Sequence, residues 1–145
     1  MKIVPFEGKH IDEWEAIERT CFSDPWTRGM MEEGLDNPLS VNLALLSGDG
    51  RLAGYGCMYH VCGEGCVSNI AVAPNERGKG LGGALLDELI KTAQAIELEF
   101  VTLEVRASNQ AAIGLYRSRG FDPAGVRPGY YEHPREDALL MTKLL

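Results

Sequence analysis

Four glycines and two cations lie together within residues 77–83 of this 145-residue chain. Glycine lets an anion approach the backbone closely, and the first N–H groups of a helix have no partner inside that helix. The segment follows strand-forming residues and precedes an amphipathic stretch, and Arg77 and Lys79 add positive charge to it. It therefore predicts a site for a ligand with several phosphates, the alternative being a solvated surface turn.

Two nucleotide-binding motifs resemble this segment. The P-loop pattern, GxxxxGK followed by Ser or Thr, does not occur in the chain. The dinucleotide pattern GxGxxG does occur, at Gly78, Gly80 and Gly83, and Glu104 follows at the distance of a ribose-binding acid. In that fold the strand runs almost directly into the first glycine, whereas five residues separate Val72 from Gly78 here. Because too little chain remains for a second nucleotide-binding half, we reject this interpretation.

Glu104 lies within 100–105, a run rich in strand-forming residues. Strand alternation places its carboxylate on the face opposite Leu103 and the neighbouring apolar side chains. Such a carboxylate can accept a proton as a general base, or it can form an ion pair with Arg106 or Lys79. The residues alone do not decide between these two roles.

Asn109 and Tyr116 are seven residues apart in the predicted helix 109–119. Seven steps of about 100° come within about 20° of two full turns, so both side chains lie on one face. The amide of Asn109 can bind a peptide-like ligand or cap the helix. The phenol of Tyr116 can donate a proton or pack in the core as an amphipathic residue.

The four cysteines are Cys21, Cys57, Cys62 and Cys66, and His60 lies among them. A zinc site is one interpretation, but the chain has no CxxC pair. Alternation in their shared strand puts Cys57 on the face opposite His60 and Cys62. We therefore expect free thiols and no metal.

The rest of the sequence predicts the elements that position these residues. Strands are predicted at 2–6, 41–47, 51–62, 66–73, 100–105, from Phe121, and at 138–143. Helices are predicted at 10–22, from the N-cap Thr27 to about 35, at 82–98 and at 109–119, and 126–137 is expected to be a loop. The order predicts one α/β domain of the α+β type over residues 1–145, with a mixed sheet.

Composition and charge exclude several classes of protein. With 45% hydrophobic and 24% charged residues, the chain matches an ordinary globular domain. The net charge of −7 argues against non-specific binding of nucleic acid and would attract cationic partners. No apolar run reaches the about 18 residues of a membrane span and no signal-peptide pattern begins the chain, so we expect a cytoplasmic protein without membrane association.

Arg77, Gly80 and Gly82 also fit the pattern Arg-x-x-Gly-x-Gly, which resembles the acyl-CoA pyrophosphate loop of the GNAT N-acetyltransferases. The likeness covers nearly the whole chain. Further residues that match the family pattern are 69–72, 103–109, 111–113, 115–116 and 120–121. Residues 21–22, 25–27, 130–131 and 135–138 resemble the RimI-type branch, whose members acetylate the N-terminal alanine of a small-subunit ribosomal protein.

The resemblance implies a fold and a cofactor. The implied fold is a mixed, mostly antiparallel sheet of about six to seven strands with about four flanking helices and splayed central strands. Acetyl-CoA is the implied co-substrate, and no metal is implied. The residues implied to bind it are Ile70, Ala71, Val72, Arg77, Gly78, Lys79, Gly80, Leu81, Gly82, Gly83 and Asn109.

The resemblance also assigns catalytic and acceptor-binding roles. Glu104 corresponds to the proton acceptor, and Tyr116 to the donor that protonates the departing thiolate in a direct transfer within a ternary complex. Trp26, Tyr130 and Tyr131 correspond to residues that bind the acceptor, the N-terminal peptide of a ribosomal protein. The implied activity is therefore N-terminal protein acetylation.

Two alternatives stay open for the function. RimI-type chains often have Asn and Pro where this chain has Gly129 and Glu132, so another amine remains possible as acceptor: a polyamine, lysine, an amino acid or an aminoglycoside. A non-catalytic acyl-CoA-binding module is the second alternative. The pair of a candidate base and a candidate proton donor favours an enzyme.

Overall fold

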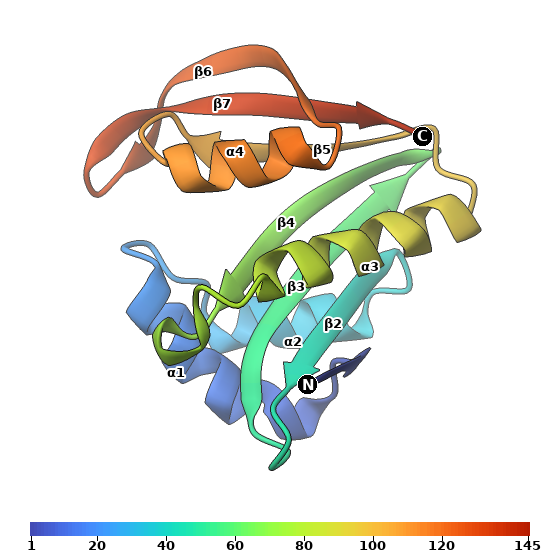
Figure 1. Ribbon diagram of the computed structural model, residues 1–145, viewed down its shortest axis with the longest axis vertical. Coiled ribbons are helices and arrows are strands. Elements are labelled where there is room, and N and C mark those ends of the chain that lie inside the picture. The colour runs from blue at the N-terminus through green and yellow to red at the C-terminus, as the bar shows by residue number, and fades with distance from the viewer.

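Seven strands form one mixed sheet in the order β1-β2-β3-β4-β5-β7-β6, in a computed structural model that describes residues 1–145 (Figure 1). Only β4 and β5 are parallel neighbours. The strands are β1 (Lys2–Pro5), β2 (Ser40–Leu46), β3 (Leu52–Val61), β4 (Glu64–Val72), β5 (Phe100–Arg106), β6 (Asp122–Glu132) and β7 (Arg135–Leu144). The helices are α1 (Ile11–Cys21), α2 (Arg28–Asp36), α3 (Leu81–Ala95) and α4 (Gln110–Ser118), with 3-10 turns at Gly8–His10 and Pro74–Glu76.

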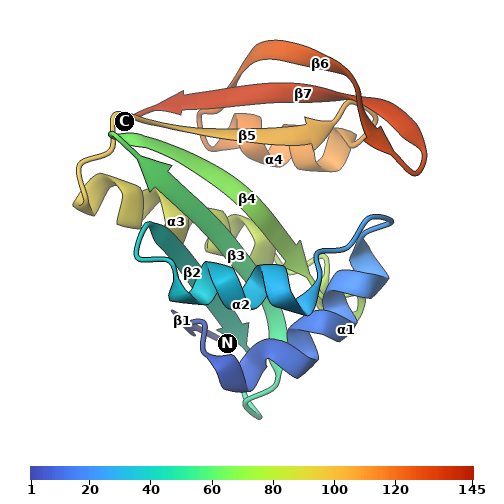
Figure 2. The same ribbon diagram turned by 180° about the vertical axis from the view of Figure 1, so that it is seen from behind.

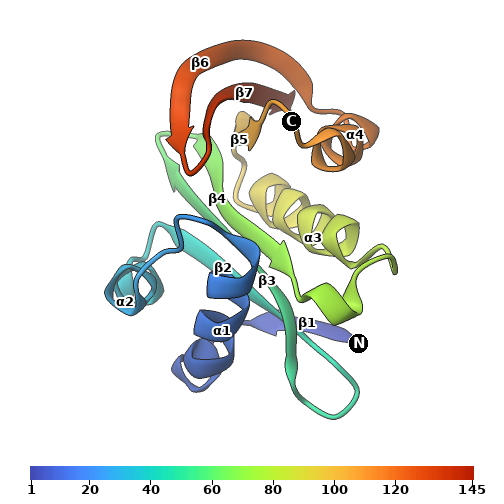
Figure 3. The ribbon, with the colours of Figure 1, turned by 90° about the vertical axis from the view of Figure 1, so that its left-hand side faces the viewer.

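The helices cover both faces of the sheet. α1 and α2 lie on one face and α3 and α4 on the other, which Figures 2 and 3 show from two directions. One core cluster lies on the α1 side and includes Trp14, Ile17, Met31, Tyr55 and Cys57. The larger cluster lies on the α3 and α4 side and includes Leu86, Leu89, Leu103, Tyr116, Phe121 and Met141. No helix is both long and apolar enough to cross a membrane.

Local sequence signals explain most of these elements. Thr27 caps α2 as predicted, because its hydroxyl accepts a hydrogen bond from the N–H of Met30 at 3.2 Å. β5 alternates between half-buried and buried residues, which confirms the predicted faces of this strand. The helix predicted at 82–98 ends earlier, at Ala95, and Ile96 just beyond it is 43% exposed.

The two parallel strands separate part-way along their length. Their pairing runs from Glu64 opposite Phe100 to Val67 opposite Leu103 and stops there, although both strands continue. Next to this point the register between β3 and β4 shifts, which leaves Ser68 as the extra residue of a bulge. The splay implied by the family resemblance is thus confirmed, and the divergence of β4 from β5 is visible in Figure 1.

The predicted loop at 126–137 is wrong. This region is a hairpin of β6 and β7, and β7 begins well before the predicted strand at 138. The two prolines and two glycines of β6 hide its strand pattern, since such residues usually mark turns. They are tolerated because β6 is an exposed edge strand with irregular register against β7.

Candidate active site

The splay between β4 and β5 opens into a cleft of about 790 Å³. Its walls come from both strands, from α4, from the segment after α1 and from the β6–β7 hairpin. The cleft therefore gathers residues from almost the whole length of the chain. The predicted site residues that line it are Trp26, Ile70, Glu104, Asn109, Tyr116, Tyr130 and Tyr131.

Glu104 points into this cleft with a side chain that is 21% exposed. Its Oε1 lies 3.2 Å from the Nε of Arg127, and its Oε2 is buried without a hydrogen-bond partner. Arg106 and Lys79, the two cations considered as its partners, pair with other carboxylates. The Glu104 carboxylate therefore keeps an oxygen free to accept a proton.

Tyr116 lines the same cleft from α4 and is 7% exposed. Its ring packs against Phe121, with the ring centroids 6.1 Å apart. Burial raises the pKa of Tyr116 to about 12, so the phenol stays protonated at neutral pH. A protonated phenol in the cleft can act as a proton donor.

Asn109 combines the two roles considered for it. It is the N-cap of α4, and its Oδ1 accepts a hydrogen bond from the N–H of Ala112 at 3.2 Å. The same residue lines the cleft alongside Tyr116. The cap fixes the amide at the start of the helix and leaves its NH₂ group available for a ligand.

The glycine-rich segment lies outside the cleft lining, between the carboxyl end of β4 and the start of α3. Gly78 and Gly80 have φ values of +81° and +75°, which disfavour residues with a side chain. The first hydrogen bond of α3 runs from the N–H of Ala84 to the carbonyl of Gly80, so the preceding amides have no helical partner. This helix start can hold an anionic group.

The two predicted cations of the segment make contacts within the chain. Arg77 donates to the carbonyl of Val72 at 3.3 Å and contacts the Sγ of Cys21 at 3.2 Å. Lys79 pairs with Glu76 at 2.7 Å. Both side chains therefore remain next to the glycines. Glu76 offsets the charge of Lys79, whereas Arg77 has no carboxylate partner.

Two tyrosines of β6 form one wall of the cleft. The rings of Tyr130 and Tyr131 meet edge to face at 89°, with centroids 5.1 Å apart. Between Arg127 and Tyr131 the register of β6 against β7 shifts, and Gly129 has a φ of +60°. This bulge turns successive tyrosines toward the cleft, since a bulge re-aims the side chains beside it. The Arg106 guanidinium lies 4.4 Å from the centroid of Tyr131.

The family model described as "Acetyltransferase (GNAT) family" matches residues 11–121. The chain belongs to the GNAT acetyltransferase family. This match spans α1 to the end of α4, and it includes the glycine-rich segment, Glu104 and Tyr116.

Individual members of the family are similar over most of this chain. The "[Ribosomal protein bS18]-alanine N-acetyltransferase" of Escherichia coli is 43% identical over 128 residues, which are 87% of this chain and 85% of that protein. A Bacillus subtilis relative is 38% identical over 90% of this chain and 87% of its own length. The crystal structure of the E. coli ribosomal-protein-S18-alanine N-acetyltransferase superposes with a TM-score of 0.91 at 34% identity, covering 99% of this chain and 92% of that one.

Glu18 is a cleft residue of this GNAT protein that the sequence did not indicate. It is 2% exposed, and its carboxylate accepts hydrogen bonds from the N–H of Trp26 at 2.8 Å, the phenol of Tyr55 at 2.7 Å and the amide of Asn69 at 2.8 Å. These donors come from three different segments. Glu18 thus fixes Trp26 against the strands that floor the cleft. A glutamate on an amphipathic helix gives no signal of this role, because its partners are distant in sequence.

Arg119 is the second residue that the sequence did not indicate. A Cβ at Gly83 would collide with the Nη2 of Arg119, so the guanidinium occupies the space above this glycine. Its Nε lies 3.2 Å from Asp87. Arg119 therefore adds a third cation to the glycine-rich segment, from the end of α4.

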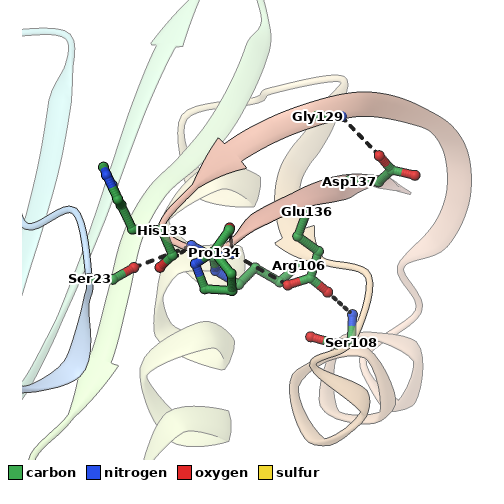
Figure 4. Close-up of polar contacts among 8 residues, drawn as sticks. All are labelled: Ser23, Arg106, Ser108, Gly129, His133, Pro134, Glu136 and Asp137. Carbon is green, nitrogen blue, oxygen red and sulfur yellow. Dashed lines mark hydrogen bonds and ion pairs between the residues drawn. The ribbon is translucent and has the colours of Figure 1, made fainter.

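A polar network ties the β6–β7 turn to the segment after α1 (Figure 4). The guanidinium of Arg106 donates to the carbonyl of Pro134 at 2.9 Å, contacts Glu136 at 3.3 Å and reaches the hydroxyl of Ser23 at 3.3 Å. Glu136 in turn accepts from the N–H of Ser108 at 2.6 Å. Gly129, also shown in Figure 4, is held by a separate bond from its N–H to Asp137, at 2.8 Å. The network fixes one edge of the cleft.

The cysteines do not gather into a site. Cys57 is buried and Cys62 exposed, Cys21 and Cys66 line the cleft, and all four are free thiols. No group of three or more His, Cys, Asp or Glu side chains is arranged to hold a metal ion. The zinc interpretation therefore has no geometric support.

Proposed function

We propose that this protein transfers the acetyl group of acetyl-CoA to the N-terminal α-amine of a ribosomal protein that begins with alanine. One observation carries the proposal: a carboxylate and a protonated phenol, Glu104 and Tyr116, line one cleft between splayed strands. The 43% identity to the E. coli alanine N-acetyltransferase supports the choice of acceptor.

The acetyl-CoA would lie along the unpaired edge of β4. Beyond Val67 this strand has no partner on the β5 side, so the backbone of Ile70, Ala71 and Val72 can pair with the amides of the pantetheine arm. Asn109 lines the same cleft and can add a side-chain hydrogen bond. No metal is required to orient this substrate.

The pyrophosphate would bind where α3 begins. Here helix amides precede the first helical hydrogen bond, and cations lie beside the glycines. The residues that would form this site are Arg77, Gly78, Lys79, Gly80, Leu81, Gly82 and Gly83.

The reaction needs a neutral amine, a polarised thioester and a proton for the thiolate. An α-amine has a pKa of about 7.7–8.0 and is mostly protonated at neutral pH. The ammonium first releases one proton to solvent, which leaves a neutral nitrogen. Glu104 accepts a second proton from this nitrogen, directly or through water, as the nitrogen attacks the thioester carbonyl carbon. When the carbon–sulfur bond breaks, Tyr116 donates its proton to the sulfur. Exchange with solvent then returns the proton on Glu104 to Tyr116, which leaves an amide and CoA.

The acceptor would enter past Trp26, Tyr130 and Tyr131. The net charge of −7 favours the approach of a basic ribosomal peptide, an effect on association rate. Gly129 and Glu132, where the RimI-type branch often has other residues, affect which side chains the slot accepts. We assign the activity to a single domain, residues 1–145, acting in the cytoplasm without a membrane or nucleic-acid partner.

Mass spectrometry of candidate acceptors after incubation with acetyl-CoA tests this proposal. Alanine-initiated ribosomal peptides should gain one acetyl group at the α-amine, and the Glu104→Gln variant should leave them nearly unmodified. Acetylation confined to a polyamine, lysine, a free amino acid or an aminoglycoside would replace the proposed acceptor. Binding of acetyl-CoA without acetylation of any amine would identify a non-catalytic acyl-CoA-binding module.

A further inference from the structure

We propose that Arg127 is a built-in competitor of the acceptor: its guanidinium occupies the place of the acceptor's ammonium group in the free protein. The acceptor must therefore displace Arg127 before Glu104 can act on it. This inference rests on the proposed function, because it takes Glu104 as the group that meets the amine.

The contacts of Arg127 define a small cation site. The Nε of Arg127 lies 3.2 Å from Oε1 of Glu104, and its guanidinium carbon lies 5.8 Å from the ring centroid of Tyr130. A carboxylate next to an aromatic ring binds a primary ammonium as well as a guanidinium, because both are cationic hydrogen-bond donors. The chain's own side chain thus fills a site whose chemistry suits the proposed substrate.

The second oxygen of Glu104 indicates that this site is incomplete. Oε2 is buried and has no hydrogen-bond partner, although a carboxylate can accept several hydrogen bonds. Leaving such an atom unsatisfied carries a desolvation cost. An ammonium group has three N–H donors and can satisfy both oxygens, whereas Arg127 contacts only one.

Arg127 is placed so that it can move away. Its side chain is 57% exposed, and Glu104 is its only ion-pair partner. Arg106, which lies over the ring of Tyr131, provides the contrast: it is 24% exposed and held by Pro134, Ser23 and Glu136. Arg106 is thus fixed by several contacts, whereas Arg127 can rotate away from Glu104 by breaking one ion pair.

The expected consequence is specific to the acceptor. Removing the guanidinium should strengthen acceptor binding by about two- to fivefold, since exposed ion pairs have a weak net effect. Acetyl-CoA binding should not change, because Arg127 belongs neither to the cleft lining nor to the glycine-rich segment that would bind acetyl-CoA. A merely structural role for Arg127 would change thermal stability and leave acceptor affinity unaltered.

Isothermal titration of an alanine-initiated ribosomal peptide into the protein saturated with CoA tests the inference without turnover. Arg127→Gln should bind the peptide about two- to fivefold more tightly than the wild type, and Arg127→Lys, which keeps the charge, should bind like the wild type. Arg51→Gln is the matched control, since Arg51 is an exposed arginine paired with Asp49 at 2.9 Å in the turn between β2 and β3.

Two results would overturn this role of Arg127. One is equal or weaker peptide binding by folded Arg127→Gln, whether or not its melting temperature changes. The other is no measurable peptide binding by the wild type or the variant. Neither depends on product formation, so a failure of the proposed reaction would be seen separately, as unmodified peptide in the mass spectrum.

Discussion

Glu104 of β5 and Tyr116 of α4 line one cleft although they lie on different elements. Both reach this cleft because β4 and β5 stop pairing after Val67 and Leu103, which opens the sheet beside them. A regular parallel pair would close this space with backbone hydrogen bonds. The divergence of the strands is therefore the structural cause of the proposed site.

Replacing Glu104 tests its role as the proton acceptor. Glu104→Gln keeps the size of the side chain and removes its basicity, so the turnover number should fall about 10²- to 10⁴-fold. The affinity for acetyl-CoA, measured by calorimetry, should stay the same. Glu88→Gln on α3 is the control and should retain full activity. Turnover close to that of the wild type would assign Glu104 a structural role.

Replacing Tyr116 tests its role as the proton donor. Tyr116→Phe removes only the hydroxyl and keeps the packing against Phe121, so the melting temperature should change little. The turnover number should fall by about tenfold or more, because the thiolate leaves without a positioned acid. An unaltered rate under conditions in which the chemical step limits turnover would remove this assignment.

The glycine-rich segment can be tested with a matched pair of glycines. Gly80 and Gly50 have φ values of +75° and +84°, and no atom lies within 4 Å of an added Cβ at either position. A valine at either position should therefore cost about 1–2 kcal/mol of stability. Only Gly80→Val should also weaken acetyl-CoA binding, as measured by calorimetry. Equal affinities for the two variants would place the pyrophosphate elsewhere.

Alkaline pH should unfold this protein through its buried phenols and a thiol. Burial raises the pKa of Cys57 and of Tyr116 to about 12 each, and burial beside Glu18 also raises the pKa of Tyr55. The ordinary values are 9.0 for the thiol and 10.0 for the phenols. At a pH between the ordinary pKa of such a group and its raised pKa in the folded protein, the unfolded chain binds fewer protons than the folded one. The free energy of unfolding therefore falls as the pH rises.

The size of this alkaline effect can be measured by urea denaturation from pH 8 to pH 11. Below about pH 9 the free energy of unfolding should not change through these groups. Above about pH 9 the Cys57 thiol, and above about pH 10 each of the two phenols, contributes a loss that approaches about 1.4 kcal/mol per pH unit. The Cys57→Ala variant should show a smaller loss between about pH 9 and pH 10. A free energy of unfolding that stays constant up to pH 11 would contradict the burial of these groups.

The glycine-rich segment and the cleft-facing side of β5 could be predicted because their signals are local. Residues 77–83 show the glycines and cations together, and alternation alone places Glu104 opposite Leu103. The splay is implied only by the family resemblance, since neither the end of the β4–β5 pairing nor the bulge at Ser68 beside it has a local sequence signal. The start of β6 is predicted, as a strand from Phe121, but its continuation from residue 126 is not, because its prolines and glycines are typical of a loop.

The contacts that complete the site could not be predicted from local sequence. Glu18 and Asn69 are 51 positions apart, and Arg127 and Glu104 meet only because β6 lies beyond β7 in the sheet. Periodicity places a side chain on a face but does not say which distant side chain faces it. Such pairs follow from the strand order, which a single sequence does not state.

A crystal structure of the protein with bound acetyl-CoA tests the central claim most directly. The account predicts the pantetheine along Ile70–Val72, the sulfur within hydrogen-bond distance of the Tyr116 hydroxyl and the pyrophosphate on the amides at the start of α3. Acetyl-CoA bound at another surface, with the space between β4 and β5 unchanged, would contradict it.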